Sequence, residues 1–293
     1  MLSASAIVVS CAACGMERTE NYKIYNGHQL NKCSRCGFVF TAERKFPVNQ
    51  YEDVYSGLTA YRMMIDDARL TFEGKSGYRQ LWWFKRKALS WLHGRLSSGH
   101  LLDLGSGPGT LLMVAHRKYG YEVQGVEPAS AAAAVANGYG VPTFCGTVEE
   151  YCAHAREKFD AITSFEVLEH VPDPLSFLSS AKRLLKDQGV LLLSVPNLDD
   201  RYCLHQQIKP AMPPIHINFF SRKSLRFLLK RAGFKMQRTY TLPIPTSSVR
   251  NIHGLRGFIL RIPYLAITRL FECQDGTTLL VMATPFSHGP NLH

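Results

Sequence analysis

The chain has 293 residues and carries 34 lysines and arginines against 23 aspartates and glutamates, a formal net charge of +11. This length suits one domain of ordinary size with a small accessory unit. No apolar stretch is long enough to span a bilayer, and the start MLSASAIVVS lacks the basic and apolar regions of a secretion signal, so we expect a soluble, cytoplasmic protein.

Two CxxC pairs near the start of the chain predict a metal site. Cys11 with Cys14 and Cys33 with Cys36 are separated by eighteen residues, and a glycine follows each pair. This spacing is typical of a zinc ribbon, in which four thiolates close a tetrahedral and therefore structural site. We expect the ribbon at residues 1–46; an iron site of rubredoxin type and four unliganded thiols are the alternatives. The other cysteines show no such spacing and are expected to be buried.

Strand and helix signals alternate along the rest of the chain. We expect a linker and a helical segment at residues 47–98, with an aromatic and basic helix at 80–96, and the main domain at 99–293. The expected strands lie at 101–105, 121–127, 141–147, 159–165 and 189–196, and the expected helices at 108–119, from 130 onward, at 148–156 and at 174–186. A helix at 221–233 and strands at 234–242 and 277–285 close the domain. The alternation predicts an α/β fold with a Rossmann-like, doubly wound and mostly parallel sheet.

The run HLLDLGSGPGTLL predicts a strand that ends in a glycine loop. Gly105, Gly107 and Gly109 allow the backbone to approach a ligand closely, and Pro108 suits the first turn of a helix. The following strand ends at Glu127, whose carboxylate can accept hydrogen bonds from two ribose hydroxyls. These features indicate a ligand that contains a nucleoside; a dinucleotide site and a plain structural turn are the alternatives.

A second group of polar residues follows the strand expected at 159–165. Glu166, Glu169 and His170 are spaced so that a helical turn would place them on one face. Two carboxylates and an imidazole could hold Mg2+ or Mn2+ with positions open for substrate oxygens. The alternatives are a metal-free site with His170 or His216 as the general base, and side chains that only stabilise the start of a helix.

The DLGSGPG loop and the acidic end of the next strand resemble class I S-adenosylmethionine-dependent methyltransferases. The resemblance implies a seven-stranded sheet and S-adenosylmethionine as the cofactor. The cofactor-binding residues that it implies are Asp103, Gly105, Ser106, Gly107, Gly109, Glu127, Pro128, Thr147, Val148 and Phe165. Thr147 stands where the family often has an acidic residue, so the backbone of Val148 or the side chain of Glu149 is the expected substitute.

The EVLEHV segment is similar to segments of two groups of O-methyltransferases, which act in ubiquinone biosynthesis and on the ribose 2′-hydroxyl of small RNAs. This resemblance implies divalent-metal binding and catalysis by Glu166, Glu169 and His170, completed by His216 of the HINFFS segment. The chain also resembles small bacterial methyltransferases with an N-terminal CxxCG and CxxCGFVFT ribbon and a closing HxNFFSxxSLxxLLxxAGF element. Many of these act on hydroxyls of sugars or other small molecules.

Basic residues are concentrated in one part of the chain. Residues 201–271 contain thirteen lysines and arginines and no acidic residue. We expect this part to bind an anionic acceptor, such as a nucleotide-linked sugar, a polyprenyl phosphate glycan, a phosphorylated metabolite or RNA; a solvated helical face is the alternative. Residues 243–272 are expected to form a lid insertion, with peripheral contact to an anionic membrane as a second interpretation.

The leading hypothesis is an S-adenosylmethionine-dependent O-methyltransferase. Its expected acceptor is a hydroxyl of a sugar, a glycan precursor or another diol-bearing small molecule, with or without help from Mg2+ or Mn2+. An RNA methyltransferase that modifies ribose or base is the first alternative, because the basic region could contact phosphates. A binding module without methyl transfer is the second, and the presence of Asp103, the three glycines and Glu127 argues against it.

Overall fold

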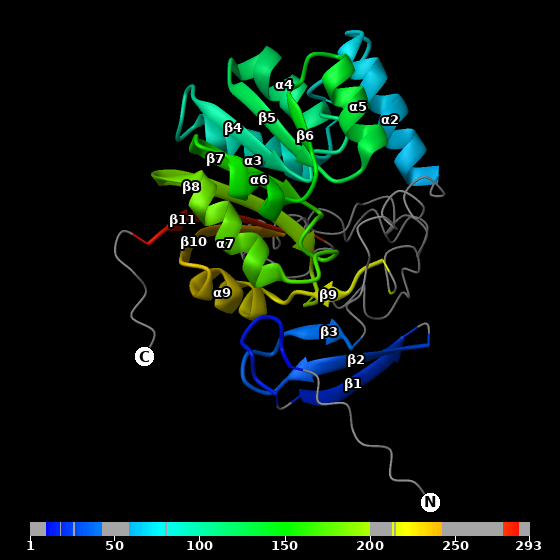
Figure 1. The fold of residues 1–293 in the computed structure, drawn as a ribbon, viewed down its shortest axis with the longest axis vertical. Helices are drawn as coiled ribbons and strands as arrows, with labels where there is room; N and C mark the ends of the chain where they lie inside the picture. Colours follow the sequence, from blue (N-terminus) through cyan, green and yellow to red (C-terminus); the bar gives the residue numbers. More distant parts are fainter. Residues whose placement is uncertain are drawn as a thin grey trace, which may run out of the picture.

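A seven-stranded sheet forms the centre of the protein and confirms the predicted α/β fold (Figure 1). The computed structural model describes residues 10–17, 19–25, 27–42, 59–79, 81–199, 213, 215–241 and 278–286. The strands of this sheet are β4 (His100–Leu104), β5 (Glu122–Glu127), β6 (Thr143–Cys145), β7 (Phe159–Phe165), β8 (Leu185–Pro196), β10 (Phe234–Thr241) and β11 (Thr278–Pro285). Their order in space is β10-β11-β8-β7-β4-β5-β6.

Most of these strands run parallel, in the arrangement of a doubly wound sheet. β4 pairs in parallel with β5 on one side and with β7 on the other, and β6 and β8 extend the parallel set. β11 runs antiparallel to both β8 and β10. The strand order reverses between β4 and β7, so the carboxyl ends of these two strands form the topological switch point at which such sheets bind ligands.

Helices cover both faces of the sheet (Figure 1). They are α2 (Thr59–Phe72), α3 (Trp83–His93), α4 (Thr110–Tyr119), α5 (Ser130–Gly138), α6 (Val148–His154), α7 (Pro174–Leu184) and α9 (Arg222–Arg231). Apolar side chains of α6, α7 and α9 pack on one face, and those of α2, α3 and α4 pack on the other. Side-chain caps begin three of these helices: Thr147 forms a capping box in α6, Asp173 accepts hydrogen bonds from backbone N–H groups of α7, and Ser221 forms a capping box in α9.

The N-terminal segment forms part of a second, four-stranded sheet (Figure 1). Its strands are β1 (Thr19–Tyr25), β2 (His28–Cys33), β3 (Val39–Thr41) and β9 (Asn218–Phe219), in the order β1-β2-β3-β9. The pairing of β3 with β9 is antiparallel, and Arg231 of α9 donates a hydrogen bond to the Ala13 carbonyl oxygen at 3.0 Å. The ribbon is therefore joined to the main domain by backbone pairing.

One expected helix start was wrong, and the helical turn considered for residues 166–170 is absent. α4 begins at Thr110 and not at Pro108, because Gly109 has a left-handed φ of 81° that no residue inside an α-helix adopts. Residues 166–170 form a bend and a turn instead of starting a helix, and Glu166 itself has a φ of 58°. The three polar side chains of this segment therefore do not share one helical face.

The burial expected for the remaining cysteines is confirmed for Cys152 but wrong for Cys145, which is exposed at the end of β6. Cys203 and Cys273 lie outside the described residues, as does the lid expected at 243–272. Within the described ranges, no helix has the length and apolar character needed to cross a bilayer.

Candidate functional site

The glycine loop lies at the carboxyl end of β4, as the sequence predicted. Gly105, Gly107 and Gly109 all have positive φ, between 54° and 81°. A Cβ at Gly105 would collide with the side chain of Val167, and one at Gly107 would lie 3.3 Å from the Met64 methyl group of α2. Glycine is therefore required here both by backbone conformation and by close packing.

Glu127 lies at the carboxyl end of the neighbouring strand and contacts this loop. Its carboxylate accepts hydrogen bonds from the backbone N–H groups of Gly107 at 2.7 Å and Ala129 at 3.0 Å. The side chain is buried, and this burial raises the pKa of its carboxyl above the usual value. Each carboxylate oxygen retains a further lone pair, so Glu127 can still accept hydrogen bonds from ribose hydroxyls.

Asp103, in the strand that leads into the glycine loop, is buried and interacts with Thr163 and Lys85. The Thr163 hydroxyl donates to Asp103 Oδ1 at 2.7 Å, and burial raises the pKa of Asp103 to about 7. Lys85 of α3 opposes this shift, and burial in turn lowers the pKa of its ammonium while Asp103 and Glu166 act to raise it. The sequence analysis missed Lys85. The signal that could have identified it is a lysine that ends the aromatic run LWWFK, because a charged side chain in an apolar segment needs a partner when it is buried.

The raised pKa of Asp103 predicts a stability that depends on pH. Below about pH 4 the Asp103 carboxyl is protonated in both the folded and the unfolded protein. As the pH rises to 7, this carboxyl ionises first in the unfolded protein, so the free energy of unfolding falls. Asp103→Asn, which can still accept the Thr163 hydrogen bond, should be more stable than the wild type at pH 8, by roughly 1–4 kcal/mol, but not near pH 4. Urea denaturation at both pH values checks this, and an equal difference at both would contradict it.

Glu166 follows β7 and is hydrogen-bonded to another strand, although, together with burial, its charge also raises the pKa of Glu169. The Ser194 hydroxyl of β8 donates to Glu166 Oε1 at 2.7 Å. Burial raises the pKa of this carboxyl to about 7, with Lys85 opposing the shift. The left-handed backbone of Glu166 turns its side chain toward β8, which the expected helical turn would not have done.

Glu169, His170 and His216 form a cluster of candidate metal ligands, with ligand atoms within 4.8 Å of one another; Glu169 is buried and the histidines are largely buried. Glu169 Oε1 lies 3.9 Å from His170 Nε2 and 4.0 Å from His216 Nε2. Both Glu169 oxygens are buried and accept no hydrogen bond from any described group. Burial raises the pKa of Glu169 well above its usual value and lowers the pKa of His170 to about 4. Neutral imidazoles facing an unsatisfied carboxylate are the donor set of a divalent metal site.

One histidine of this cluster is oriented by the backbone. His170 Nδ1 lies 2.9 Å from the Ile215 carbonyl oxygen, which can only accept, so Nδ1 carries the proton. His170 Nε2 is then the unprotonated nitrogen and faces Glu169. This arrangement is the usual support of a metal-binding histidine.

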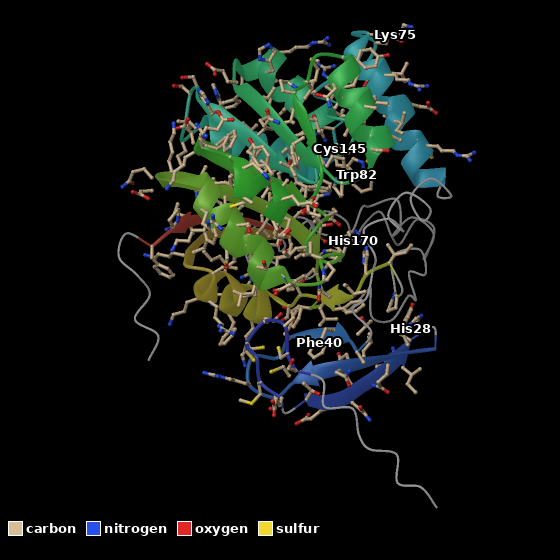
Figure 2. All side chains as sticks on the ribbon, in the orientation of Figure 1. His28, Phe40, Lys75, Trp82, Cys145 and His170 are labelled. Atoms are coloured by element: carbon tan, nitrogen blue, oxygen red, sulfur yellow. The ribbon has the colours of Figure 1, made fainter. Side chains whose placement is uncertain are left out.

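Hydrogen bonds fix the segment that carries His216 on two sides. The N–H groups of Ile217 and Asn218 donate to the Glu169 carbonyl oxygen at 2.9 and 3.0 Å. The Asn218 side-chain amide donates to the carbonyl oxygens of Leu168 and Val171 at 3.0 and 2.7 Å. On the other side β9 pairs with β3 of the ribbon. Figure 2 shows His170 on the side of the main domain that faces the ribbon.

The four cysteines predicted to bind a metal do converge. Cys11, Cys14, Cys33 and Cys36 are buried, and their sulfur atoms lie within 4.8 Å of one another. Each CxxC pair ends in a tight turn whose following glycine, with φ of 73° or 72°, donates its N–H to the first cysteine's carbonyl oxygen. The cluster fits the knuckle geometry of a zinc ribbon.

The other predicted cofactor residues lie around the same edge of the sheet. Ser106 and Pro128 flank the contact between the glycine loop and Glu127, and Ser106 N donates to the Val126 carbonyl oxygen at 3.1 Å. Thr147 caps α6 in a capping box with Glu150, and buried Val148 follows it. Phe165 ends β7 and contacts Phe84 edge to face, with ring centroids 5.9 Å apart. Their roles toward a cofactor stay predictions.

Comparisons with known proteins agree with this geometry. A family model described as a methyltransferase domain matches residues 79–239. The ubiquinone biosynthesis O-methyltransferase of Actinobacillus pleuropneumoniae is 41% identical over 108 residues, which cover 33% of this chain and 45% of that protein. The chain thus spans less than half the length of this curated relative.

Solved structures share the fold at low sequence identity. The 1,6-didemethyltoxoflavin-N1-methyltransferase of Burkholderia thailandensis, solved with S-adenosylhomocysteine, has a TM-score of 0.52 and 18% identity, covering 92% of this chain and 100% of its own. The (4+2) cyclase SpnF has a TM-score of 0.53 and 16% identity, covering 82% and 97%. A methyltransferase and a cyclase can thus have this fold, so the reaction must be argued from the site residues.

Proposed function

Because the chain belongs to the methyltransferase domain family, whose model matches residues 79–239, we propose that it transfers the methyl group of S-adenosylmethionine to a hydroxyl oxygen. The proposed acceptor is a sugar, a glycan precursor or another small molecule with adjacent hydroxyls. The observation that carries this proposal is the cluster of Glu169, His170 and His216 beside the glycine loop. Val167 links the two, since it contacts Gly105 and stands two residues before Glu169.

The cofactor would be held by residues of three neighbouring elements. The open backbone of the glycine loop can approach it, and Glu127 can accept hydrogen bonds from its ribose. Its methionine part carries one ammonium and one carboxylate. Lys85, which interacts electrostatically with both Asp103 and Glu166, offers a cation to that carboxylate, while the two acidic side chains offer acceptors to the ammonium.

The side chains of the Glu169 cluster also offer ligand atoms for a divalent metal ion. The two unsatisfied oxygens of Glu169 and the two imidazoles fit such an ion, which would lower the pKa of a bound hydroxyl and orient adjacent acceptor oxygens. Two nitrogen ligands favour Mn2+, Fe2+, Co2+ or Zn2+ over Mg2+, which prefers oxygen. Without a metal, His170 Nε2 or His216 Nε2 can accept the hydroxyl proton as the acceptor oxygen attacks the methyl group.

The four-cysteine cluster would hold a structural zinc ion. Its four ligand positions are all protein thiols, so no position is left for a substrate. Its proposed role is to stabilise the ribbon and, through the pairing of β3 with β9, the segment that carries His216.

Replacing Glu127 by alanine is expected to weaken S-adenosylmethionine binding by about 10- to 100-fold. The substitution removes the expected acceptor of the ribose hydroxyls and also the anchor of the Gly107 N–H group, which donates to it at 2.7 Å. Calorimetric titration with S-adenosylhomocysteine measures the affinity. Glu122→Ala, at the exposed start of the same strand, is the control. Equal affinities in both variants would remove Glu127 from the cofactor site.

The function is tested by transfer of labelled methyl groups. The protein is incubated with labelled S-adenosylmethionine and a cell extract that is afterwards separated into RNA, glycolipid and small-molecule pools. We expect alkali-stable label in a non-RNA pool, as an ether methyl group gives. Label in RNA would replace the proposed acceptor class, and no label in any pool, with cofactor binding intact, would favour a binding module.

A further inference from the structure

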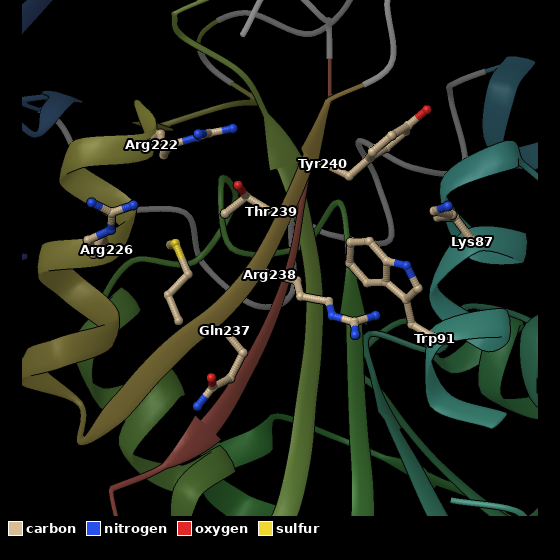
Figure 3. Close-up of a pocket in the computed structure, with 9 residues that line it drawn as sticks. Lys87, Trp91, Arg222, Arg226, Gln237, Arg238, Thr239 and Tyr240 are labelled. Atoms are coloured by element: carbon tan, nitrogen blue, oxygen red, sulfur yellow. The ribbon is translucent and has the colours of Figure 1, made fainter. Parts of the chain in front are cut away.

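A groove outside the residues described so far crosses the open edge of the seven-stranded sheet (Figure 3). Its volume is about 460 Å³, within the range of small-molecule sites. The lining comes from two helices and the edge strand: Lys87 and Trp91 of α3, Arg222 and Arg226 of α9, and Met236, Gln237, Arg238, Thr239 and Tyr240 of β10. None of these side chains belongs to the glycine loop, the Glu169 cluster or the ribbon.

A β-bulge directs the side chains of the edge strand to both walls of this groove. The register of β10 against β11 shifts between Met236 and Arg238, so Gln237 is the extra residue. Met236 packs against the core on the α9 side, whereas Tyr240 packs on the α3 side. Figure 3 shows Arg238 directed toward Trp91. Bulges at sheet edges commonly redirect side chains in this way and reduce pairing with other strands.

The groove concentrates positive charge, and none of its cations forms a side-chain ion pair with another described residue. Lys87, Arg222, Arg226 and Arg238 line it, and no acidic residue does. Across the ranges that the structure describes, none of these four side chains lies within 4.0 Å of a carboxylate. Four cations that line one groove from both sides of β10 repel each other and attract an anion (Figure 3). Arginine side chains in particular match the geometry of phosphate oxygens.

One wall of the groove is aromatic. The Lys87 ammonium lies 5.1 Å from the ring centroid of Tyr240 and 5.8 Å from that of Trp91. The Trp91 indole is half-buried and faces the Arg238 guanidinium across the groove (Figure 3). Planar rings beside cations are the combination that binds the base and phosphates of nucleotides.

The groove is separate from the cofactor loop, but its Tyr240 lies level with Phe165 at the carboxyl end of the parallel strands, where the loop also lies. Tyr240 contacts Trp83, Trp83 contacts Phe84 and Phe84 contacts Phe165, with ring centroids 5.7, 5.6 and 5.9 Å apart. This aromatic layer, of which Phe84 and Phe165 are buried, separates the groove from the end of β7. At the other wall, α9 begins at Arg222, whose N–H donates to Asp199 Oδ2 just beyond β8.

We propose that this groove binds the nucleoside diphosphate part of the acceptor. The arginines contact the two phosphates, Trp91 stacks on the base, and the hydroxyl-bearing part attached to the diphosphate extends past Arg222 toward the Glu169 cluster. Only that last step rests on the proposed function. Binding of a free nucleoside diphosphate requires no methyl transfer and can be measured alone.

The test is calorimetric titration of the full chain, at low salt, with ADP, GDP, UDP and CDP and with inorganic pyrophosphate. At least one nucleoside diphosphate should bind more tightly than pyrophosphate. The double variant Arg226→Ala/Arg238→Ala should weaken this binding by at least about tenfold. The matched control is Lys230→Ala/Lys235→Ala, which removes two exposed cations from the same helix and strand outside the groove. Titration with S-adenosylhomocysteine verifies that both variants are folded.

A third variant separates the base from the phosphates. Trp91→Ala should weaken binding of the nucleoside diphosphate but leave that of pyrophosphate within about twofold. No binding of any diphosphate, equal losses in the two double variants, or binding of an RNA oligonucleotide alone would each overturn the proposal. Nucleoside diphosphate binding without methyl transfer to any acceptor would instead contradict the proposed function and leave the groove assignment standing.

Discussion

Glutamine in place of Glu169 is expected to lower the rate of methyl transfer about a thousandfold while leaving the affinity for S-adenosylmethionine within about twofold. Glu169 is fully buried, and neither of its oxygens accepts a hydrogen bond from a described group. Both imidazole Nε2 atoms lie within 4.0 Å of Oε1. Glutamine keeps the shape of the side chain but removes the charge that would hold a cation.

The control for this variant is Glu122→Gln, which makes the same change at an exposed glutamate that contacts His100 Nε2 at 3.0 Å. Such surface pairs contribute little to stability, so the control should retain full activity. Turnover is measured with each protein before and after dialysis against a weak chelator, with zinc content recorded. Binding of Mn2+ or Co2+ at a second site is measured by titration and should be absent only in the Glu169 variant.

Two results would contradict the metal interpretation in different ways. Full turnover of Glu169→Gln, with or without chelator, would remove this residue from the mechanism. A loss of turnover with no dependence on added metal in the wild type would favour proton transfer to His170 or His216 instead.

The sheet could be predicted because its signals are local. β7 has the same bounds, Phe159–Phe165, as the expected strand, and α7 begins at the expected Pro174 after the Asp173 cap. Apolar runs, caps and glycines each act within a few residues. The same reasoning identified the two CxxC pairs, because the two cysteines of each pair lie in a single tight turn.

The arrangement of the polar residues could not be predicted in this way. Helical spacing suggested that Glu166 would join Glu169, but its left-handed backbone directs it to Ser194 of another strand. His216 reaches the cluster through a two-residue strand, β9, which is too short to show any periodicity. The pairing of Phe40 with Asn218 joins parts of the chain that are distant in sequence, and such a contact cannot be predicted from a local sequence pattern.

The pairing of β3 with β9 also predicts that the ribbon supports the Glu169 cluster. Serine in place of both Cys14 and Cys33 is expected to lower the affinity of the cluster for Mn2+ by more than about tenfold, although neither cysteine belongs to it. Their sulfur atoms lie 3.4 Å apart in the four-thiol group, so the double substitution removes half of the ligands. Loss of a structural zinc site generally unfolds its own small module.

The coupling runs through backbone hydrogen bonds. Without the ribbon, Phe219 and Asn218 lose β3 as a partner, and the Thr41 N–H no longer holds the Ile217 carbonyl oxygen at 3.0 Å. Ile217 and Asn218 in turn hold the Glu169 carbonyl. A local opening of this segment moves His216 away from Glu169, whereas β4 and β5, which pair with each other and with neither β3 nor β9, keep their backbone hydrogen bonds.

Hydrogen exchange measures this opening directly. In the Cys14→Ser/Cys33→Ser variant, amides of residues 215–220 should exchange at least about tenfold faster, with those of β4 and β5 unchanged. Cys145→Ser/Cys152→Ser is the matched control, since it makes the same two changes in cysteines outside the ribbon. Unchanged exchange at 215–220 together with wild-type Mn2+ affinity would show that the ribbon and the cluster are independent. Faster exchange with lost Mn2+ binding and retained cofactor affinity would make the ribbon a positioning element of the site.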